Sequence, residues 1–572
     1  MFLNKSHFSR FIKAAFLLAL VYAIAGVIVS APVFADDTKS NSDSVDASNT
    51  PIEQIVDPVI VQSIETVIKG WTSSAAKPGE IFERNARDVL KFYKARDYNP
   101  LWYGQNGWDE KSEALLSVIE ASDQEGLNPD HYLPAKLRED FRNNTDLQPV
   151  MIAVLDILQT AALMHYAIDV KEGRYAEVRE LKPREVLKLG LTADSFEDWL
   201  RELPPQKPSY QQLRSYLPLY QALARDESWP TLSINKSIRP KSKTSKIAVI
   251  REQLYRLGDW DADIQKSTRM PHGIQLSEDA TINDPNYYDQ DLVRAVMIFQ
   301  SRHGLDVDGI IGRQTVEHLN MAPNFRLRQI KANLERLRWQ KNEDAKRYVH
   351  VNIAAFWLKA FENGEQVLEM PVVVGRQKRP TPVLNDKIIN LKFSPDWTIP
   401  PTIIEKDYMP KLQENPFYFE ELGWPVEHYG QSTPGYLIDW YSVNPKSVSV
   451  SQPPGPNAPL GGVRFSLTND QFIYLHDTPG KGVFKKNFRA VSSGCVRVGD
   501  APALAQYLLN QEGWSSDKIR NAMTSGNTKY KSLKEPVSVS LSYLTAWIDD
   551  FGVLQFRPDI YGLDEDLIAR MG

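Results

Sequence analysis

The spacing of apolar residues changes from a helical to an alternating period near residue 347. Before that point apolar residues recur at intervals of three and four, which is the spacing of one face of an α-helix. The clearest stretches of this kind lie at residues 89–96, 155–166 and 213–220. Beyond residue 347, Val349, Val351 and Ile353 alternate with polar residues, which is typical of a half-buried strand. We therefore predict a largely helical amino-terminal part and a mainly-β carboxyl-terminal third.

A short module between these parts shows two apolar helix faces. The residues on these faces are Ile247, Ile250, Leu254 and Leu257, then Leu292, Val296 and Phe299. Asp289 precedes the second face and can cap that helix, because its carboxylate can accept from free N–H groups of the first turn. The pattern predicts a compact module at residues 241–322. A further apolar face predicts a linking helix at residues 323–346.

Two hairpins are predicted in the β region. Asn363-Gly364 lies between two apolar runs and favours a tight turn with positive φ. The second hairpin crosses residues 468–471, and its strands are marked by Val463, Phe465 and Leu467, then by Phe472, Tyr474 and His476. Tyr474 and His476 share one face of their strand, because successive side chains alternate. We therefore expect His476 at the end of a strand beside an aromatic ring.

Composition narrows the class of protein. The chain has 572 residues, 42% of them apolar, which is room for roughly three or four ordinary domains. It has 67 basic and 72 acidic residues, for a net charge of -5. Since no long run of Lys or Arg follows the amino terminus, we expect no nucleic-acid partner.

The amino terminus has the pattern of an export signal. Lys5, Arg10 and Lys13 precede an apolar run at residues 14–31, and small residues then lead to Ala35. This pattern predicts a signal peptide at residues 1–35. The alternative is an uncleaved anchor, with residues 14–31 as a membrane tether, because the run approaches the ~20 residues that span a bilayer. Either interpretation places the bulk of the chain outside the cytoplasm, in the periplasm. Residues 36–58 are polar and predict a flexible linker.

Cys495 is the single cysteine of the chain. In an exported protein it cannot form an internal disulfide, so its thiol must be either used or buried. A thiol becomes a nucleophile when a nearby imidazole takes its proton, and His476 is the candidate base. Gly494 allows a sharp bend, so that the N–H groups of Gly494 and Cys495 can face a developing oxyanion.

These residues resemble a family signature. His476, a gap of 15 residues and then Ser492-Ser493-Gly494-Cys495-Val496-Arg497 resemble the motif of L,D-transpeptidases of the YkuD fold. Ser493 stands where that motif usually has a second histidine. The stretch from Phe299 to Gly312 is similar to the peptidoglycan-binding domain type 1, a small three-helix module.

Further stretches resemble the large subgroup of these enzymes typified by YcbB. They are Gly375 with Thr381-Pro382, residues 394–401, residues 452–455, Leu460-Gly461 and residues 545–547. The resemblance implies a multidomain α+β protein: a helical scaffold, the wall-binding module, and a mainly-β catalytic domain with a helical lid insertion. We place the scaffold at residues 59–240, the catalytic domain at 347–555, the insertion at about 402–445 and a carboxyl-terminal tail at 556–572. Tyr408, Met409, Leu412 and Phe419 are the expected apolar anchors of the insertion.

The resemblance also implies a reaction. Cys495 attacks the third-position diamino acid of a peptidoglycan tetrapeptide stem, D-alanine leaves, and a neighbouring stem takes up the acyl group. No metal or organic cofactor is expected, and carbapenem-type β-lactams are expected covalent inhibitors.

Four further residues are expected at the substrate: Tyr474, Arg497, Ser492 and Trp397. Arg497 either binds a substrate carboxylate or clamps the carbonyls of its own turn. Tyr474 either stacks on the stem or fills a core, and Trp397 has packing as its alternative.

Three other hypotheses remain open. The same cysteine chemistry could use water or a lipoprotein lysine as the acceptor. The chain could instead be a wall-binding scaffold without catalysis. It could also be a structural protein with an inert core thiol, in which case alkylating agents would leave Cys495 unmodified.

Overall fold

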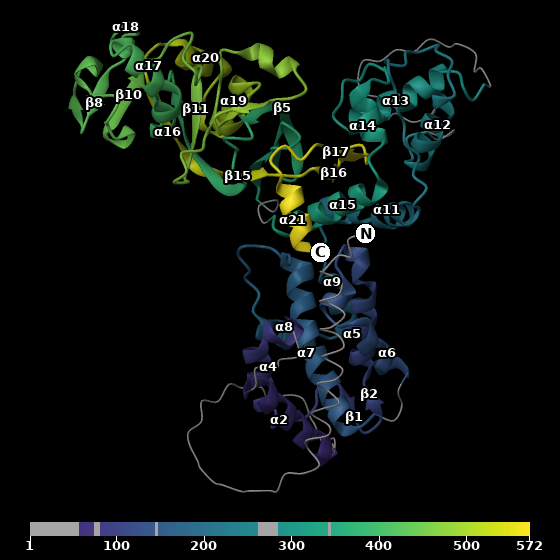
Figure 1. Cartoon of the computed structure of the whole chain (residues 1–572). Coiled ribbons are helices and arrows are strands. Elements are labelled where there is room, and N and C mark those ends of the chain that lie inside the picture. Colours follow the sequence, from purple (N-terminus) through teal and green to yellow (C-terminus); the bar gives the residue numbers. More distant parts are fainter. Residues whose placement is uncertain (1–56, 74–79, 144–146, 261–283, 341–344, 572) are drawn as a thin grey trace. The chain divides into compact units, whose positions relative to one another are not determined.

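The computed structural model describes residues 57–73, 80–143, 147–260, 284–340 and 345–571. The predicted signal and nearly all of the predicted linker lie outside the described residues. The described parts of Met1–Gln221 and Leu337–Trp339 form one compact unit, and those of Ala222–Arg336 and Gln340–Gly572 form the other (Figure 1).

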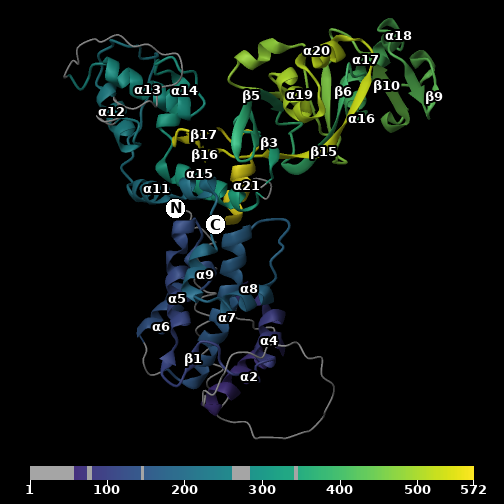
Figure 2. The ribbon, with the colours of Figure 1, turned by 180° about the vertical axis from the view of Figure 1, so that it is seen from behind.

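The first unit is built around a long central helix, α7 (Pro149–Glu172). Every residue from Ile152 to Val170 is buried, so α7 is covered on all sides. Among the described residues α7 alone has the length and composition to cross a membrane, but 94% of its most apolar window is buried within the unit. The elements of the unit that accompany α7 are α2 (Pro58–Ser73), α3 (Glu80–Glu83), α4 (Ala86–Lys94), β1 (Tyr103–Gly104), β2 (Gly107–Trp108), α5 (Glu110–Glu120), α6 (Ala135–Asn143), α8 (Pro183–Leu191), α9 (Phe196–Glu202) and α10 (Pro208–Arg214) (Figure 2).

The predicted helices of this region are present. The pattern at residues 213–220 divides between α10 and α11 (Leu217–Arg225), with Leu213, Leu217 and Tyr220 all buried. Buried carboxylates within the core are paired or hydrogen-bonded. Asp169, for example, accepts two bonds from Arg84, at 2.6 and 3.0 Å.

The second unit begins with the small helical module. Its helices are α12 (Lys246–Arg256), α13 (Gln290–Arg302) and α14 (Arg313–Leu319). The Asp289 carboxylate accepts from the N–H of Leu292 at 2.9 Å, which confirms the predicted cap. Residues 261–283 of the predicted module lie outside the described residues. The predicted linking helix is α15 (Pro323–Arg338).

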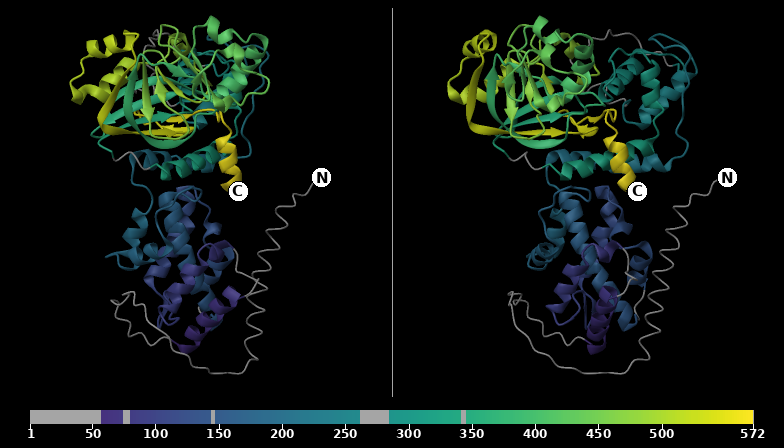
Figure 3. Two further views of the ribbon diagram at one scale, coloured as in Figure 1. Left: turned by 90° about the vertical axis from the view of Figure 1, so that its left-hand side faces the viewer. Right: turned by 60° about the vertical axis from the view of Figure 1, so that its left-hand side comes forward.

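The mainly-β part forms one sheet that returns on itself. The described strands follow the order β13-β5-β14-β12-β11-β6-β15-β3-β4, and β4 also pairs with β5. Figure 3 shows this curvature in two views. The strands are β3 (Arg347–Asn352), β4 (Trp357–Glu362), β5 (Glu365–Gly375), β6 (Leu384–Phe393), β11 (Val463–Leu467), β12 (Leu475–His476), β13 (Ala490–Ser492), β14 (Val496–Val498) and β15 (Lys529–Ser542).

One face of these strands packs into an apolar core, together with α19 (Ala501–Leu509). Asp500 caps α19 by accepting from the N–H of Ala503. After α19 the chain continues through α20 (Ser516–Thr524) into β15. The opposite face of the sheet is therefore left for polar residues.

The two predicted hairpins have different outcomes. Asn363 and Gly364 have φ of 54° and 84°, which confirms the first. In the second, β11 and β12 do pair antiparallel, but Phe472 does not continue the strand, because its φ is 58° and it is 81% exposed. The Asn469 carboxamide accepts from the N–H groups of Gln471 and Ile473, both at 3.1 Å. This side chain thus holds a wider turn than the alternating pattern predicts.

The insertion has its own small core and is mixed rather than purely helical. Leu412 and Phe419 are fully buried and Tyr408 and Met409 pack against them, so the expected apolar anchors lie in this core. A short sheet in the order β7-β10-β8-β9 accompanies the helices. The elements are β7 (Trp397–Thr398), α16 (Pro401–Ile403), the π-helical turn η5 (Ile404–Tyr408), α17 (Met409–Glu414), α18 (Tyr418–Glu421), β8 (Val426–His428), β9 (Gln431–Ser432) and β10 (Val448–Gln452).

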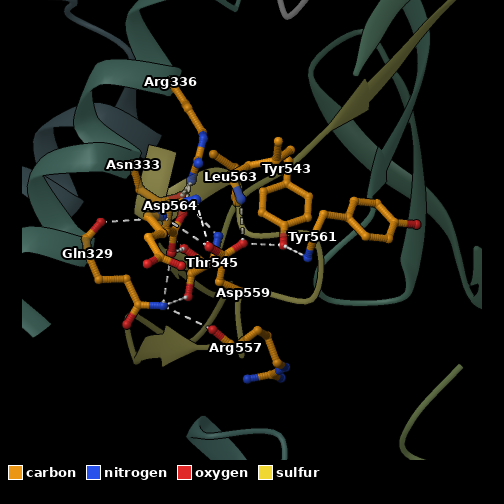
Figure 4. A network of polar contacts seen from close by, with 12 residues as sticks. Gln329, Asn333, Arg336, Tyr543, Thr545, Arg557, Asp559, Tyr561, Leu563 and Asp564 are labelled. Atoms are coloured by element: carbon orange, nitrogen blue, oxygen red, sulfur yellow. Dashed lines mark hydrogen bonds and ion pairs between the residues drawn. The ribbon is translucent and has the colours of Figure 1, made fainter. Parts of the chain in front are cut away.

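The carboxyl-terminal segment is folded, and the prediction of a tail at residues 556–572 was wrong. After β16 (Ala546–Ile548) and β17 (Leu554–Phe556) the chain forms α21 (Leu563–Met571). Asp559 accepts from the N–H groups of Leu563 and Asp564, at 3.0 and 2.8 Å, and so caps this helix. Asp564 in turn pairs with Arg336 of α15 and accepts from Thr545 at 2.6 Å (Figure 4). These polar contacts fix a segment whose apolar pattern is weak.

Replacing Asp564 with Asn should therefore destabilise the second unit. Asp564 is 2% exposed, so the variant leaves the buried Arg336 guanidinium without its anion, at a cost of about 3 to 5 kcal/mol. Urea denaturation followed by circular dichroism measures the change. Asp566→Asn, at an exposed position of the same helix, is the matched control and should change stability by less than about 0.5 kcal/mol. Equal stability of both variants would contradict the importance of this ion pair.

Candidate active site

The candidate nucleophile and base lie on two adjacent parallel strands. In β12 and β14, Leu475 is in register with Val496, and His476 with Arg497. Leu475 and Val496 are both fully buried in the core. Because side chains alternate along a strand, the residues on either side of this pair face outward together. The outward residues are Tyr474, His476, Cys495 and Arg497. The sheet register thus brings four of the predicted site residues onto one face.

His476 is held by its own backbone. The ring is 4% exposed, and its Nδ1 donates to the carbonyl oxygen of Asp477 at 2.5 Å, which leaves Nε2 as the acceptor. The Asp477 carboxylate does not orient the ring, since it accepts from the N–H of Gly462 at 2.9 Å and from Lys481 at 2.6 Å. A backbone carbonyl, rather than a carboxylate, therefore orients the ring. Burial, and next the Arg497 guanidinium, lower the pKa of His476 to about 3, so the imidazole is neutral.

Cys495 lies in the turn between β13 and β14, so a short strand separates it from α19. Its Sγ donates to the carbonyl of Phe472 at 3.6 Å, and the residue is partly accessible. Burial raises the pKa of the Cys495 thiol, while hydrogen bonding to Tyr474 and the charges of Arg464 and Arg497 lower it in part. Since the imidazole is neutral and the thiol pKa is raised, the resting state is a neutral pair.

The turn before Cys495 depends on glycine and on a buried hydroxyl. Gly494 has φ of 120°, a conformation that side chains other than hydrogen rarely adopt. Its carbonyl accepts from the hydroxyl of Thr381 at 2.6 Å, and that hydroxyl accepts from the N–H of Gly375 at 2.9 Å. A Cβ at Gly375 would lie 2.2 Å from the Arg379 carbonyl oxygen, so glycine is required there too. Thr381 thus anchors the catalytic turn.

Ser492 closes the turn from within. Its hydroxyl donates to the Cys495 carbonyl at 2.7 Å and accepts from the N–H of Gly494 at 3.1 Å. The Ser492 hydroxyl therefore forms its hydrogen bonds within the turn itself. The use of the Gly494 N–H for an oxyanion stays a prediction, because Ser492 occupies that donor here. The Cys495 N–H is the donor of the predicted pair that Ser492 does not engage.

Ser493 connects the catalytic turn to the insertion. Its hydroxyl accepts from Arg379 at 3.2 Å, and Arg379 forms two hydrogen bonds with Asp407 of η5, at 2.7 and 2.8 Å. Asp407 lies in a π-helical turn, an irregular geometry that recurs at functional sites. Ser493 therefore has a positioning contact where the family motif usually has a histidine.

Tyr474 and Trp397 meet beside the thiol. The Tyr474 ring lies 5.7 Å from the His476 ring, and the Arg464 guanidinium lies 5.2 Å above the Tyr474 ring. The Tyr474 hydroxyl interacts with both Cys495 and Trp397. Burial raises the pKa of Tyr474 well above its ordinary value, so the hydroxyl keeps its proton and can donate. Trp397 also packs against the core of the insertion, which is its packing alternative, and its contact with the substrate stays a prediction.

Arg497 forms no clamp on its own turn within the described residues. Its Nε is buried and has no hydrogen-bond partner there, and no carboxylate lies within ion-pair distance of it in that part of the chain. Burial lowers the pKa of its guanidinium. Of the two hypotheses for Arg497, these facts favour a guanidinium available to an external anion.

Four contributing residues were not identified as site residues from the sequence. They are Thr381, Arg379, Asp407 and Arg464. Each lies far along the chain from Cys495 and reaches the site only through the sheet or the insertion. Within the described residues no group of three or more His, Cys, Asp or Glu side chains could hold a metal ion.

Comparison with known families defines the class of protein to which this fold and site belong. Residues 346–536 match the family model of the L,D-transpeptidase catalytic domain, YkuD. Residues 87–217 match a Scaffold domain, and residues 272–319 match a domain described as “Putative peptidoglycan binding domain”. The chain therefore contains an L,D-transpeptidase catalytic domain of the YkuD family together with a peptidoglycan-binding domain.

A curated relative and several solved structures are similar to parts of the chain. Over 262 residues, 45% of this chain, it is 34% identical to “Putative L,D-transpeptidase” of Haemophilus influenzae, and the chain spans 53% of that relative. An L,D-transpeptidase from Mycobacterium smegmatis has 16% identity and a TM-score of 0.17, over 34% of this chain and 58% of that one. One from Stackebrandtia nassauensis has 12% identity and a TM-score of 0.19, over 54% and 97%. At these TM-scores the two structures tell nothing further about this chain.

Replacing Thr381 with Val should slow acylation of Cys495. Valine keeps the shape of the side chain but cannot donate to the Gly494 carbonyl, so the turn is free to move, and a shift of about 1 Å costs on the order of 100-fold in rate. Stopped-flow fluorescence with a carbapenem measures the acylation rate. Thr381→Ser retains the hydroxyl and should stay within about threefold of the wild type. Acylation of Thr381→Val at the wild-type rate would remove Thr381 from the site.

The pH dependence of alkylation tests the neutral pair. Because the Cys495 pKa is raised and His476 is neutral, the thiolate fraction should grow with pH through the range from 7 to 10. The rate of iodoacetamide modification, followed by intact mass, should rise across this whole range. A rate that is already constant from pH 5 upward would instead indicate a preformed thiolate-imidazolium pair.

Proposed function

We propose that this chain is an exported L,D-transpeptidase that forms cross-links between third-position diamino acid residues of peptidoglycan stems. One observation supports the proposal most strongly: a neutral imidazole, oriented through Nδ1, lies on the same sheet face as the thiol. This arrangement is what a cysteine nucleophile with a general base requires.

In the first half-reaction Cys495 attacks the carbonyl carbon between the third residue and the terminal D-alanine. The Nε2 atom of His476 takes the thiol proton as the C–S bond forms. The carbonyl oxygen becomes an oxyanion, to which the Cys495 N–H is the proposed backbone donor. His476 then gives the proton to the departing amine, and D-alanine leaves. A thioester between Cys495 and the stem remains.

In the second half-reaction the side-chain amine of a neighbouring stem attacks the thioester. His476 takes a proton from this amine and returns one to the sulfur as the C–S bond breaks. The product is an amide between two third-position residues, and the free enzyme is restored. Atoms and protons balance with no cofactor, because both steps transfer one acyl group.

Arg497 and Tyr474 are the proposed substrate contacts. Arg497 offers an unpaired guanidinium beside His476, which suits the carboxylate of the terminal D-alanine. Tyr474 presents a protonated hydroxyl beside the thiol. Trp397 acts through Tyr474, and Ser492 and Ser493 hold the turn.

The setting that we propose is the periplasm. The amino-terminal signal would direct the chain there, by cleavage or as a membrane tether, and the peptidoglycan-binding domain would hold it at the wall. Cross-linking would contribute to cell wall biogenesis and cell shape. Carbapenem-type β-lactams would acylate Cys495, because they present a strained carbonyl and a carboxylate to the same groups.

Two observations argue against the rival hypotheses. The Cys495 side chain faces away from the apolar core, and the residue is partly accessible, which disfavours an inert core thiol. The anchored, neutral His476 disfavours a scaffold without catalysis, since such a protein has no need to bury an imidazole beside a thiol. Water and a lipoprotein lysine remain alternative acceptors for the same thioester.

Intact-mass analysis with the full chain tests the proposal. Wild type incubated with a carbapenem should gain one adduct, and with tetrapeptide muropeptides it should release D-alanine and yield dimers. Cys495→Ala should do neither, with a loss of at least about 1,000-fold. His476→Gln should keep the thiol but lose most of the rate.

The reaction products show which acceptor the enzyme uses. Tripeptide without dimer indicates water as the acceptor, and a lipoprotein conjugate formed only on addition of a lysine-terminated peptide indicates that acceptor. Neither adduct nor product with the wild type would leave the wall-binding scaffold as the function.

A further inference from the structure

A row of basic side chains crosses the outer face of the sheet through the active site. The strand registers place Arg497, His476, Arg464 and Lys392 opposite one another on β14, β12, β11 and β6. Residues directly opposite on paired strands share a face. His476 therefore lies between two arginines, Arg497 on one side and Arg464 on the other.

The two arginines differ from the lysine in one respect. Lys392 is buried and forms an ion pair with Asp396 at 2.7 Å, so its charge is balanced. Arg464 and Arg497 are both half-buried, and within the described residues neither lies within ion-pair distance of a carboxylate. The Nε atoms of both are buried without a hydrogen-bond partner there.

Arg464 has two contacts of its own, and neither neutralises it. Its Nη2 donates to the Ser466 hydroxyl at 3.2 Å, and its guanidinium lies over the Tyr474 ring. These contacts fix the plane of the guanidinium but supply no negative charge. A half-buried cation without a counter-ion costs free energy in the unliganded protein, and an anionic ligand would remove that cost.

The spacing of the two guanidinium groups sets the kind of ligand. Arg464 and Arg497 stand on strands two apart, so their Cα atoms are separated by about twice the strand spacing of ~4.8 Å. With His476 between them, each guanidinium can bind a carboxylate of its own. They suit a ligand with two carboxylates that flank the reacting carbonyl.

We propose that Arg464 binds a second carboxylate of the donor stem, one that remains on the enzyme after the terminal D-alanine leaves. The proposal rests on the transpeptidase function proposed above and specifies its substrate. The carboxylate belongs to the third-position diamino acid, next to its side-chain amine. The enzyme therefore selects stems in which this carboxylate is free over stems in which it is an amide.

A pair of donors that differ at one group tests this selection. The two disaccharide tetrapeptides are identical except that the far carboxylate of the third residue is free in one and amidated in the other. Release of D-alanine by the full chain gives kcat and KM for each donor. The wild type should prefer the free acid in kcat/KM by on the order of tenfold or more, through KM, because a charge-assisted hydrogen bond is lost with the amide.

Variants of Arg464 test whether this residue causes the preference for the free acid. Arg464→Gln should lower kcat/KM for the free acid by about tenfold more than for the amidated donor, and so remove the preference, whatever effect it has on both donors alike. Arg464→Lys should restore part of it, since the charge remains. Arg520→Gln removes an exposed arginine elsewhere on the same domain and should keep the wild-type preference.

Two results would overturn the inference. One is a wild type that does not discriminate between the donors while releasing D-alanine from both. The other is an Arg464→Gln protein that keeps the full preference. If the wild type released D-alanine from neither donor, the transpeptidase function itself would fail, and this inference with it.

Discussion

The parallel pairing of β12 with β14 is the constraint on which the site depends. The pairing is fixed from the inside, because Leu475 and Val496 lie opposite each other in the apolar core. The outward side chains of Tyr474, His476, Cys495 and Arg497 are placed by that buried pair. A shift of one residue in either strand would turn His476 or Cys495 into the core, at the cost of burying a polar group and exposing an apolar one. The hydrophobic core thus enforces the catalytic geometry without contributing an atom to it.

A second constraint reaches the catalytic turn from the end of the chain. The Tyr561 hydroxyl donates to the Gly375 carbonyl at 2.5 Å and accepts from the N–H of Thr381 at 3.2 Å. Thr381 in turn holds Gly494. Tyr561 also stacks on Tyr543, whose hydroxyl donates to Asp559, the cap of α21 (Figure 4). The carboxyl-terminal segment is therefore part of the support for the active site.

The sequence predicted features that depend on residues close together in the chain. It did not predict contacts between segments that only the fold brings together. Period and motif spacing predicted the helical and β parts, the cap at Asp289, the shared face of Tyr474 and His476, and the sole thiol. The turn at Phe472 was missed because a single carboxamide, that of Asn469, overrides the alternation. Residues such as Arg464 and Asp407 could not be found, since no period or spacing relates a residue to a neighbour that only the sheet register or the insertion brings close.

Electrostatics connects substrate binding to the base. After burial, Arg497 is the largest influence that lowers the pKa of His476, and Arg464 also acts in that direction. For the pKa of the Cys495 thiol, burial and the hydrogen bonds to Tyr474 are larger influences than either arginine. A carboxylate on each guanidinium would cancel these charges, so the proton affinity of the imidazole would rise. His476 would then be a stronger proton acceptor when a stem with both carboxylates is bound. The unpaired arginines would thus make the base stronger only in the presence of the substrate, while the free enzyme keeps its thiol protonated.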